Sequence, residues 1–191
     1  MGRIIVSENV TLDGVVQDPA GGEGFRHGGW VGQIGGRGAE AAKVALDEAL
    51  GTEAMLLGRR TYEFLASRWP SRSGALADRL NSKAKYVISS TLRAPVWSNT
   101  TVLTGDPVSE ASNLKQRLAG DIVVAGSFQL VHVLLEHELV DELRLMVYPV
   151  VLGIGKRLFA ETSDKKPLRL VGNRTVAGDL ALLTYQPVGK T

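Results

Sequence analysis

The stretch Glu53-Ala-Met-Leu-Leu-Gly-Arg-Arg-Thr-Tyr-Glu63 joins a strand signal, two arginines and a helix signal. Its apolar run over 54–57 is typical of a buried strand, Gly58 ends that run, and a helical pattern begins at Thr61. Ligands of open α/β sheets bind at the carboxyl ends of the strands, where helix N-termini and arginines favour phosphate groups. The stretch therefore predicts a phosphate-binding turn, although two arginines in a turn can also be simply solvated.

Strand-like and helix-like segments alternate along most of the chain. Strands are predicted over 3–7, 54–57, 85–90, 100–103, 121–125, 140–147, 167–176 and 180–186. Helices are predicted over 39–50, from Thr61, from a Ser109 cap to about 118, and from the Gly126-Ser127 turn to 138, with 71–83 as a short helix or loop. This order predicts a single α/β domain over 1–191. It would hold about eight strands in a mostly parallel sheet, helices on both faces and a C-terminal antiparallel hairpin.

Composition excludes several classes of protein. The 191 residues carry a formal net charge of only +2, and no basic run suggests a nucleic-acid partner. Cysteine is absent, and no apolar stretch approaches the roughly 20 residues that span a bilayer. His132 and His137 are five residues apart, which does not match the spacing of helical metal ligands, so we expect no metal site. We expect a cytoplasmic protein without membrane or nucleic-acid partners.

Four predicted strands end in polar or glycine-rich turns. These turns are Gly58-Arg-Arg-Thr61, Ser89-Ser90, Thr104-Gly105 and Gly126-Ser127. If the strands are parallel, all four turns lie on one edge of the sheet, where their hydroxyls, arginines and amides suit a phosphate-bearing ligand. The alternative is that each turn uses these residues only for local backbone reasons.

A glycine-rich segment over 21–38 follows the first strand and its Asp13-Gly14 turn. Long loops with little regular structure in compact domains are usually functional or disordered, and we interpret this one as an active-site flap. Within it, Trp30 either covers the substrate or only anchors the loop.

Several motifs occur together in one order. They are Thr11-Leu-Asp-Gly14, Leu57-Gly-Arg-Arg-Thr-Tyr-Glu63, Tyr86-Val-Ile-Ser-Ser90, Val123-Val-Ala-Gly-Ser127, Leu139-Val-Asp-Glu-Leu143, Pro149-Val-Val-Leu-Gly-Ile-Gly155 and Leu158-Phe159. In this order and spacing the chain resembles the dihydrofolate-reductase-like fold. In particular, it is similar to the reductase domain at the carboxyl end of the bifunctional riboflavin deaminase-reductase.

The resemblance implies NADPH as cofactor, a small-molecule substrate and a possible homodimer. The cofactor-binding residues that it implies are Val16, Gly58, Arg59, Arg60, Thr61, Ser89, Ser90, Thr104, Ala125, Gly126, Ser127, Phe128 and Gln129. Asp13 or Thr11 would supply a proton, although Asp13 can also simply cap its turn. The substrate would meet Asn9, Trp30, Met146 and Pro149, with core packing as the alternative for Met146.

The chain departs from the family pattern in two places. Relatives often carry Gly-Gly where this chain has Ala125-Gly126. Dihydrofolate reductases also place a carboxylate early in the helix before the arginine turn, whereas here Glu40 is the closest acid and Asp47 and Glu48 lie near the helix end. The hypothesis that follows is a riboflavin-type reductase of a ribosylaminopyrimidine or a related compound. The alternatives are a dihydrofolate or pterin reductase and a non-catalytic nucleotide-binding module.

Overall fold

One eight-stranded sheet organises the chain, in the order β4-β3-β2-β5-β1-β6-β8-β7. The computed structural model describes residues 1–33 and 38–189. The strands are β1 (Arg3–Thr11), β2 (Ala54–Gly58), β3 (Ala84–Ile88), β4 (Thr100–Leu103), β5 (Asp121–Val124), β6 (Glu142–Tyr148), β7 (Leu168–Val176) and β8 (Leu180–Pro187). The six strands from β4 to β6 in this order pair in parallel, and β8 pairs antiparallel with both β6 and β7. The predicted α/β class, the mostly parallel sheet and the antiparallel C-terminal hairpin are confirmed.

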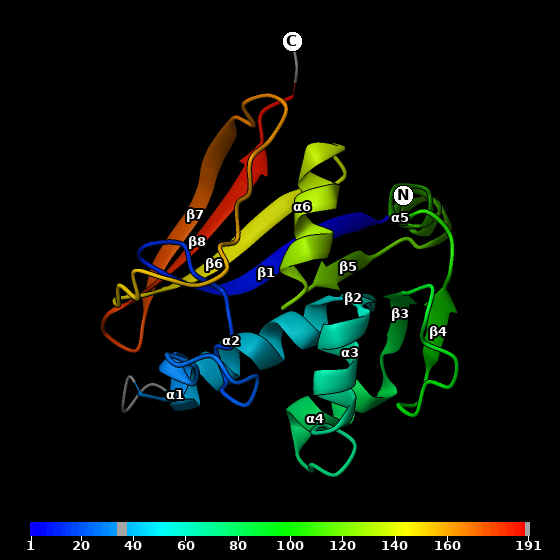
Figure 1. Cartoon of the computed structure of the whole chain (residues 1–191), viewed down its shortest axis with the longest axis horizontal. Coiled ribbons are helices and arrows are strands. Elements are labelled where there is room, and N and C mark those ends of the chain that lie inside the picture. Colours follow the sequence, from blue (N-terminus) through cyan, green and yellow to red (C-terminus); the bar gives the residue numbers. More distant parts are fainter. Residues whose placement is uncertain (34–37, 190–191) are drawn as a thin grey trace.

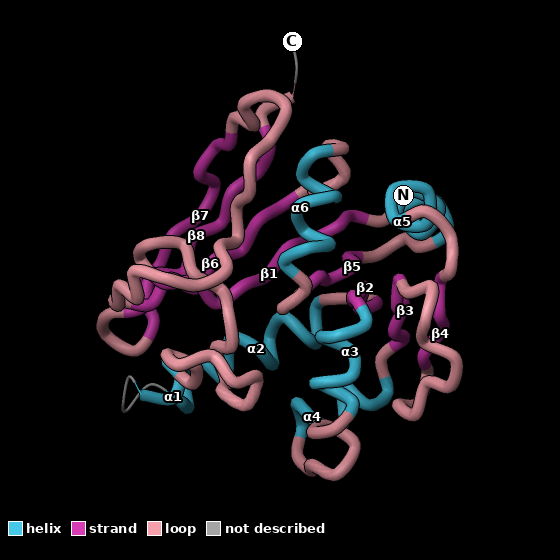
Figure 2. The backbone as a smooth tube through the Cα atoms, viewed as in Figure 1, coloured by secondary structure: helices cyan, strands magenta, loops and turns pink. Residues whose placement is uncertain are grey.

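Helices cover both faces of this sheet (Figures 1 and 2). They are α1 (Trp30–Gln33), α2 (Gly38–Gly51), α3 (Arg59–Ala66), α4 (Ala75–Ser82), α5 (Pro107–Arg117) and α6 (Phe128–Glu136). Leu114 of α5 and Leu134 of α6 lie in the largest apolar cluster, together with alternate residues of β1, β5 and β6. Tyr62 of α3 lies in a second cluster with Met55 and Leu57 of β2, on the opposite face. The core is therefore two apolar layers separated by the sheet.

Several element boundaries differ from the sequence-based expectation, and two of the differences have a clear physical cause. The fifth helix is capped by Asp106, whose side chain accepts a hydrogen bond from the backbone N–H of Ser109, so Ser109 is not the cap. Pro107 at the first helical position fits this start because it has no N–H to satisfy. The first strand runs to Thr11 rather than ending at Ser7, because β6 pairs with it over that whole length.

Two further points concern the helices and the glycine-rich segment. Region 71–83 contains the short helix α4, and α1 lies within the glycine-rich segment, of which 34–37 fall outside the described residues. No helix in the described part of the chain has both the length and the apolar character to cross a membrane.

Candidate active site

The four polar turns lie along one edge of the sheet, as the sequence predicts. They follow β2, β3, β4 and β5, which are neighbours and run parallel. Two of the turns are hydrogen-bonded to each other. The Ser127 hydroxyl accepts from the Gly58 N–H at 3.0 Å, and the Thr61 hydroxyl donates to the Gly126 carbonyl at 2.8 Å. The starts of α3 and α6 are thereby joined into one polar surface.

Gly126 is required at its place in this surface. Its φ of +66° lies in the left-handed region that favours glycine, and a Cβ there would lie 3.1 Å from the Thr61 methyl carbon. Beyond it, the predicted residues Phe128 and Gln129 form the first turn of α6. Ala125 replaces the first glycine of the family's Gly-Gly pair, and it lines a cavity beside this turn.

The two arginines of the 58–61 turn differ in their surroundings. Arg59 pairs with Glu63 one helical turn away, at 3.0 Å and about half exposed to solvent. Arg60 is exposed, and among the described residues no hydrogen bond or ion pair holds it; the nearby acid is Glu23 of the glycine-rich segment. Arg60 is therefore free to meet an anionic ligand.

The predicted residues of the next two strand ends have different roles. The Ser89 hydroxyl accepts hydrogen bonds from the N–H groups of Thr91 and Leu92, so it holds the turn that follows β3. Ser90 and Thr104 are exposed on the same edge. Only these two of the three hydroxyls are thus available to a ligand without breaking a turn.

A split in the sheet lies beside this polar edge. The pairing of β1 with β5 ends at Val6 and Val124, while β1 continues to Thr11 along β6. The chain leaves β1 toward α2 on one face and leaves β5 toward α6 on the other. In open α/β sheets, adjacent strands whose connections leave to opposite faces form the crevice where ligands bind.

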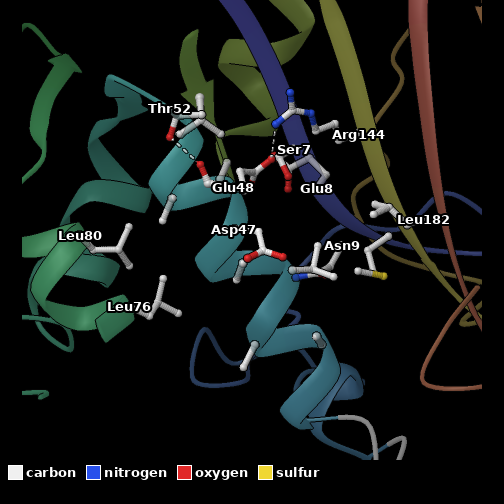
Figure 3. A pocket seen from close by; sticks show the side chains of 18 of the residues that line it. Ser7, Glu8, Asn9, Asp47, Glu48, Thr52, Leu76, Leu80, Arg144 and Leu182 are labelled. Carbon is white, nitrogen blue, oxygen red and sulfur yellow. Dashed lines mark hydrogen bonds and ion pairs between the residues drawn. The ribbon is translucent and has the colours of Figure 1, made fainter. Parts of the chain in front are cut away.

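A cavity of about 700 Å³ opens between α2 and the sheet. Figure 3 shows its polar side chains, with Glu8, Glu48 and Arg144 at one end and Asp47 and Asn9 further along. The face of α2 that lines it is rich in alanine, and the facing sheet contributes Met146, Tyr148 and Leu182. Ala42 and Ala45 of α2 border the cavity, and Ala49, the buried residue of this helix, lines it as well.

Charged groups in the wall of the cavity form a network. Arg144 bonds Glu142 at 2.7 Å and Glu48 at 3.3 Å, and so ties β6 to α2. Lys83 donates to the carbonyls of Ala49 and Thr52, at 2.6 and 2.5 Å, where α2 ends. Burial lowers the pKa of Lys83 to about 8. These charges are satisfied by the protein itself.

Glu8 is the exception among the acids of this site. It is only 7% exposed, and its Oε1 atom is buried without a hydrogen-bond partner in the described structure. Burial raises the pKa of Glu8 to about 8. The Gly126 and Ser127 backbone amides act against this rise, and the charge of Glu48 adds to it. At neutral pH the group is therefore mostly a neutral carboxylic acid.

Asp13, by contrast, is fully engaged. Its carboxylate accepts hydrogen bonds from the Thr11 hydroxyl at 2.6 Å and from the backbone N–H groups of Leu152 and Gly153 at 3.2 and 2.9 Å. Partial burial raises the pKa of Asp13, but these hydrogen bonds outweigh that effect and lower the pKa below its usual value. An ionised carboxylate with these partners caps the turn, and this geometry gives no support to a proton-donor role for Asp13 or for Thr11, which is 2% exposed.

The four predicted substrate residues separate into two groups. Asn9 and Met146 line the cavity, whereas Trp30 and Pro149 are absent from its walls. Trp30 is buried, donates its indole N–H to the Gln17 carbonyl at 3.0 Å and meets Tyr148 edge to face, so it anchors its loop. Val16 of the predicted cofactor site is also buried, within the main apolar core.

Polar lining residues that were not predicted as site residues include Ser7, Glu8, Asp47, Glu48 and Arg144. Asp47 and Glu48 were set aside for lying near the helix end, yet both face the cavity because it extends along α2 nearly to its last turn. For Glu8, one signal was present in the sequence: it lies two residues from both Val6 and Val10, so in a strand it shares their apolar face.

The fold defines an α/β protein with a crevice at the switch point of a parallel sheet. Within that class, the sequence profile of the RibD C-terminal domain matches residues 3–182, and the chain belongs to this family. The uncharacterized protein YyaP of Bacillus subtilis (strain 168) is 26% identical over 195 residues, covering 96% of this chain and 94% of YyaP.

Two solved structures share the fold. A protein from Shewanella sp. PV-4 that is named for riboflavin biosynthesis aligns with a TM-score of 0.78 at 20% identity, covering 98% of this chain and 99% of that one. The Thermotoga maritima diaminohydroxyphosphoribosylaminopyrimidine deaminase/5-amino-6-(5-phosphoribosylamino)uracil reductase aligns with a TM-score of 0.62 at 16% identity. That alignment covers 98% of this chain and 57% of the Thermotoga protein. The dihydrofolate-reductase-like fold of RibD-type proteins is therefore the fold of this chain.

Proposed function

We propose that this protein is an NADPH-dependent reductase of the riboflavin-reductase type. Membership of the RibD C-terminal domain family supports a reductase role. The observation that carries the cofactor is the junction of the 58–61 and 126–127 turns, where two helix starts, an unpaired Arg60 and a required glycine meet beside the split. The exposed arginine offers forked donors to the additional phosphate that distinguishes NADPH from NADH.

The residues present fit such a cofactor. Arg59, Arg60 and Thr61 would hold its phosphates, and the turn at Gly126 and Ser127 would face its pyrophosphate. When bound, the reduced nicotinamide supplies a hydride to the substrate. The protein's own contribution is to fix both ligands at the split and to keep water from the reacting atoms.

The substrate that we propose is a ribosylaminopyrimidine or a related small heterocycle, bound in the cavity under α2. Asn9 offers an amide, and Met146 and Leu182 offer apolar contact to a flat ring. Arg144 and Lys83 also line the cavity, but both are engaged with the protein, so phosphate recognition by them is not part of the proposal.

A pterin substrate is a second candidate, and one observation favours it. Asp47 projects from α2 toward the cavity and has no hydrogen-bond or ion-pair partner among the described residues. A carboxylate in that place can accept two N–H groups from the amino-amide edge of a pterin or of an aminopyrimidine. Oxidation of NADPH with pyrimidine and pterin compounds, each tested with the wild type and with Asp47→Asn, separates the two candidates.

The cofactor is tested by Arg60→Ala. Loss of a charge-assisted phosphate contact is expected to weaken NADPH binding by roughly tenfold or more, with a smaller effect on NADH. Arg169→Ala is the matched control, because it removes the same charge from an exposed position on β7 at the far side of the sheet. Equal NADPH affinity in both variants and the wild type, measured by fluorescence titration, would rule out the proposed clamp.

A further inference from the structure

Glu8 occupies a position that the proposed function does not yet use. Side chains alternate along β1, so Glu8 shares the side of Val6 and Val10, which pack in the core beneath α6. It nevertheless borders the cavity on the other face. Both are true because β5 parts from β1 after Val6, so Glu8 lies at the split and borders the cavity although its Oε1 atom is buried.

Within the described structure, only the Gly126 and Ser127 backbone amides hold the Glu8 carboxyl group. Its Oε1 atom is buried and unpartnered, and among the described residues no salt bridge includes Glu8. The nearest network cation, Arg144, is already bonded to Glu142 and Glu48. A buried polar atom without a partner costs about 1–3 kcal/mol, a cost that natural proteins retain mainly where a ligand or a function recovers it.

We propose that Glu8 is a ligand-binding residue of this site, and that it binds as a neutral carboxylic acid whose O–H donates to an oxygen atom of the bound dinucleotide. This inference rests on the proposed function for the identity of the ligand. The turn at Gly126 and Ser127, where the phosphates are placed, acts directly on the Glu8 carboxyl group. An ionised Glu8 would repel those phosphates, whereas the protonated form offers them, or the adjoining ribose, a donor.

Several other charged groups line the cavity beside Glu8. From α2 come Glu48 and Asp47, and from β6 comes Arg144, which stays charged over the whole accessible range. Lys83, on the cavity wall, has a pKa lowered to about 8, in the same range as Glu8. A variant that changes Glu8 alone is therefore needed to separate the two titrations.

The test is calorimetric titration of the wild-type protein with NADPH at pH 7 and pH 9, in buffers of different ionisation enthalpy. Deprotonation of Glu8 must be reversed on binding, so affinity should fall about tenfold between these pH values, and binding at pH 9 should take up a proton. The phosphates of NADPH are fully ionised over this range.

Three variants complete the design. Glu8→Gln keeps a neutral donor and should bind NADPH with near wild-type affinity at pH 7 but without the loss at pH 9. Glu8→Ala removes the donor and should bind less tightly at both pH values. Asp47→Asn removes a carboxylate from the same cavity and should keep the wild-type pH dependence.

The outcomes separate cleanly. A fall in affinity that persists in Glu8→Gln belongs to Lys83 and overturns the inference, as does wild-type binding that does not change with pH. Glu8→Ala with wild-type affinity at pH 7 also overturns it. If NADPH binds none of the proteins at any pH, the proposed cofactor fails and the inference fails with it.

Discussion

Glu8 and Asp13 lie five residues apart in the sequence, one inside β1 and one in the turn that follows it. Asp13 has a hydrogen-bond donor for each carboxylate oxygen, and its pKa is lowered. Glu8 has a buried oxygen with no partner, and its pKa is raised to about 8. The Asp13 carboxylate therefore stabilises the fold, whereas the Glu8 carboxyl group destabilises it and is available to a ligand.

The largest expected effect is on the pH dependence of stability, and Glu8→Gln reveals it. Unfolded Glu8 ionises above about pH 4.5, whereas the folded protein keeps it neutral up to about pH 8. The folded state thus binds an extra proton, and wild-type stability falls as pH rises through this interval. The decline attributable to Glu8 is up to about 5 kcal/mol, at 1.36 kcal/mol for each unit of pKa.

Urea unfolding between pH 5 and pH 8 measures this effect. The wild type should lose stability relative to Glu8→Gln as pH rises. The depressed pKa of Lys83, also about 8, acts only above this window, so it does not interfere. Parallel stability curves for the two proteins would show that Glu8 is ionised when folded and that the contrast with Asp13 is false.

Asp13→Ala tests the other side of the comparison. The variant loses three hydrogen bonds at a partly buried turn and should cost about 2–3 kcal/mol in the free energy of unfolding at pH 7. Because the pKa of Asp13 is lowered, its stabilisation is present above about pH 4 and is lost as pH falls below that value. The difference between wild type and variant should therefore shrink in acid.

Asp106→Ala is the appropriate control for Asp13→Ala. Asp106 is an exposed carboxylate that caps α5, and its removal should cost only about 1 kcal/mol. If Asp13→Ala costs no more than this control, the turn is not held by its carboxylate.

The smallest expected effect on stability belongs to Arg59→Ala. Its ion pair with Glu63 is exposed, and such pairs on helices contribute about 0.5 kcal/mol or less. The melting temperature should therefore hardly change, while NADPH affinity falls. A large loss of stability would show that Arg59, like Asp13, has a structural role rather than a ligand-binding role.

The sequence was sufficient for the parallel edge of the sheet. Strand ends at Gly58, Ser89 and Gly126 are local signals, and alternation with helices brings them together in any parallel sheet. The cavity was not predictable in the same way. Apolar periodicity in α2 predicts a packed face, but whether an alanine meets a neighbour depends on how far the helix stands from the sheet.

The role of Glu8 depends on an even less local property. Its environment is decided by the point at which β5 separates from β1, two segments more than a hundred residues apart. The strand propensity of individual residues does not predict the register of β1 against β5. For a related reason, the sequence could not decide whether Trp30 covers the substrate or anchors its loop. Its partners, Gln17 and Tyr148, are distant in the sequence and approach Trp30 only in the folded protein.

The inner wall of the cavity, formed by α2, consists largely of methyl groups at Ala41, Ala42, Ala45 and Ala49. Ala49 is buried, so a larger residue at that position would overpack its surroundings. At Ala41, Ala42 and Ala45, leucine or methionine suits the helix as alanine does. Larger residues there would narrow the chamber in small steps while leaving the rest of the protein in place. Substitutions in α2 are therefore the simplest way, in evolution or in protein engineering, to change which compounds fit the cavity.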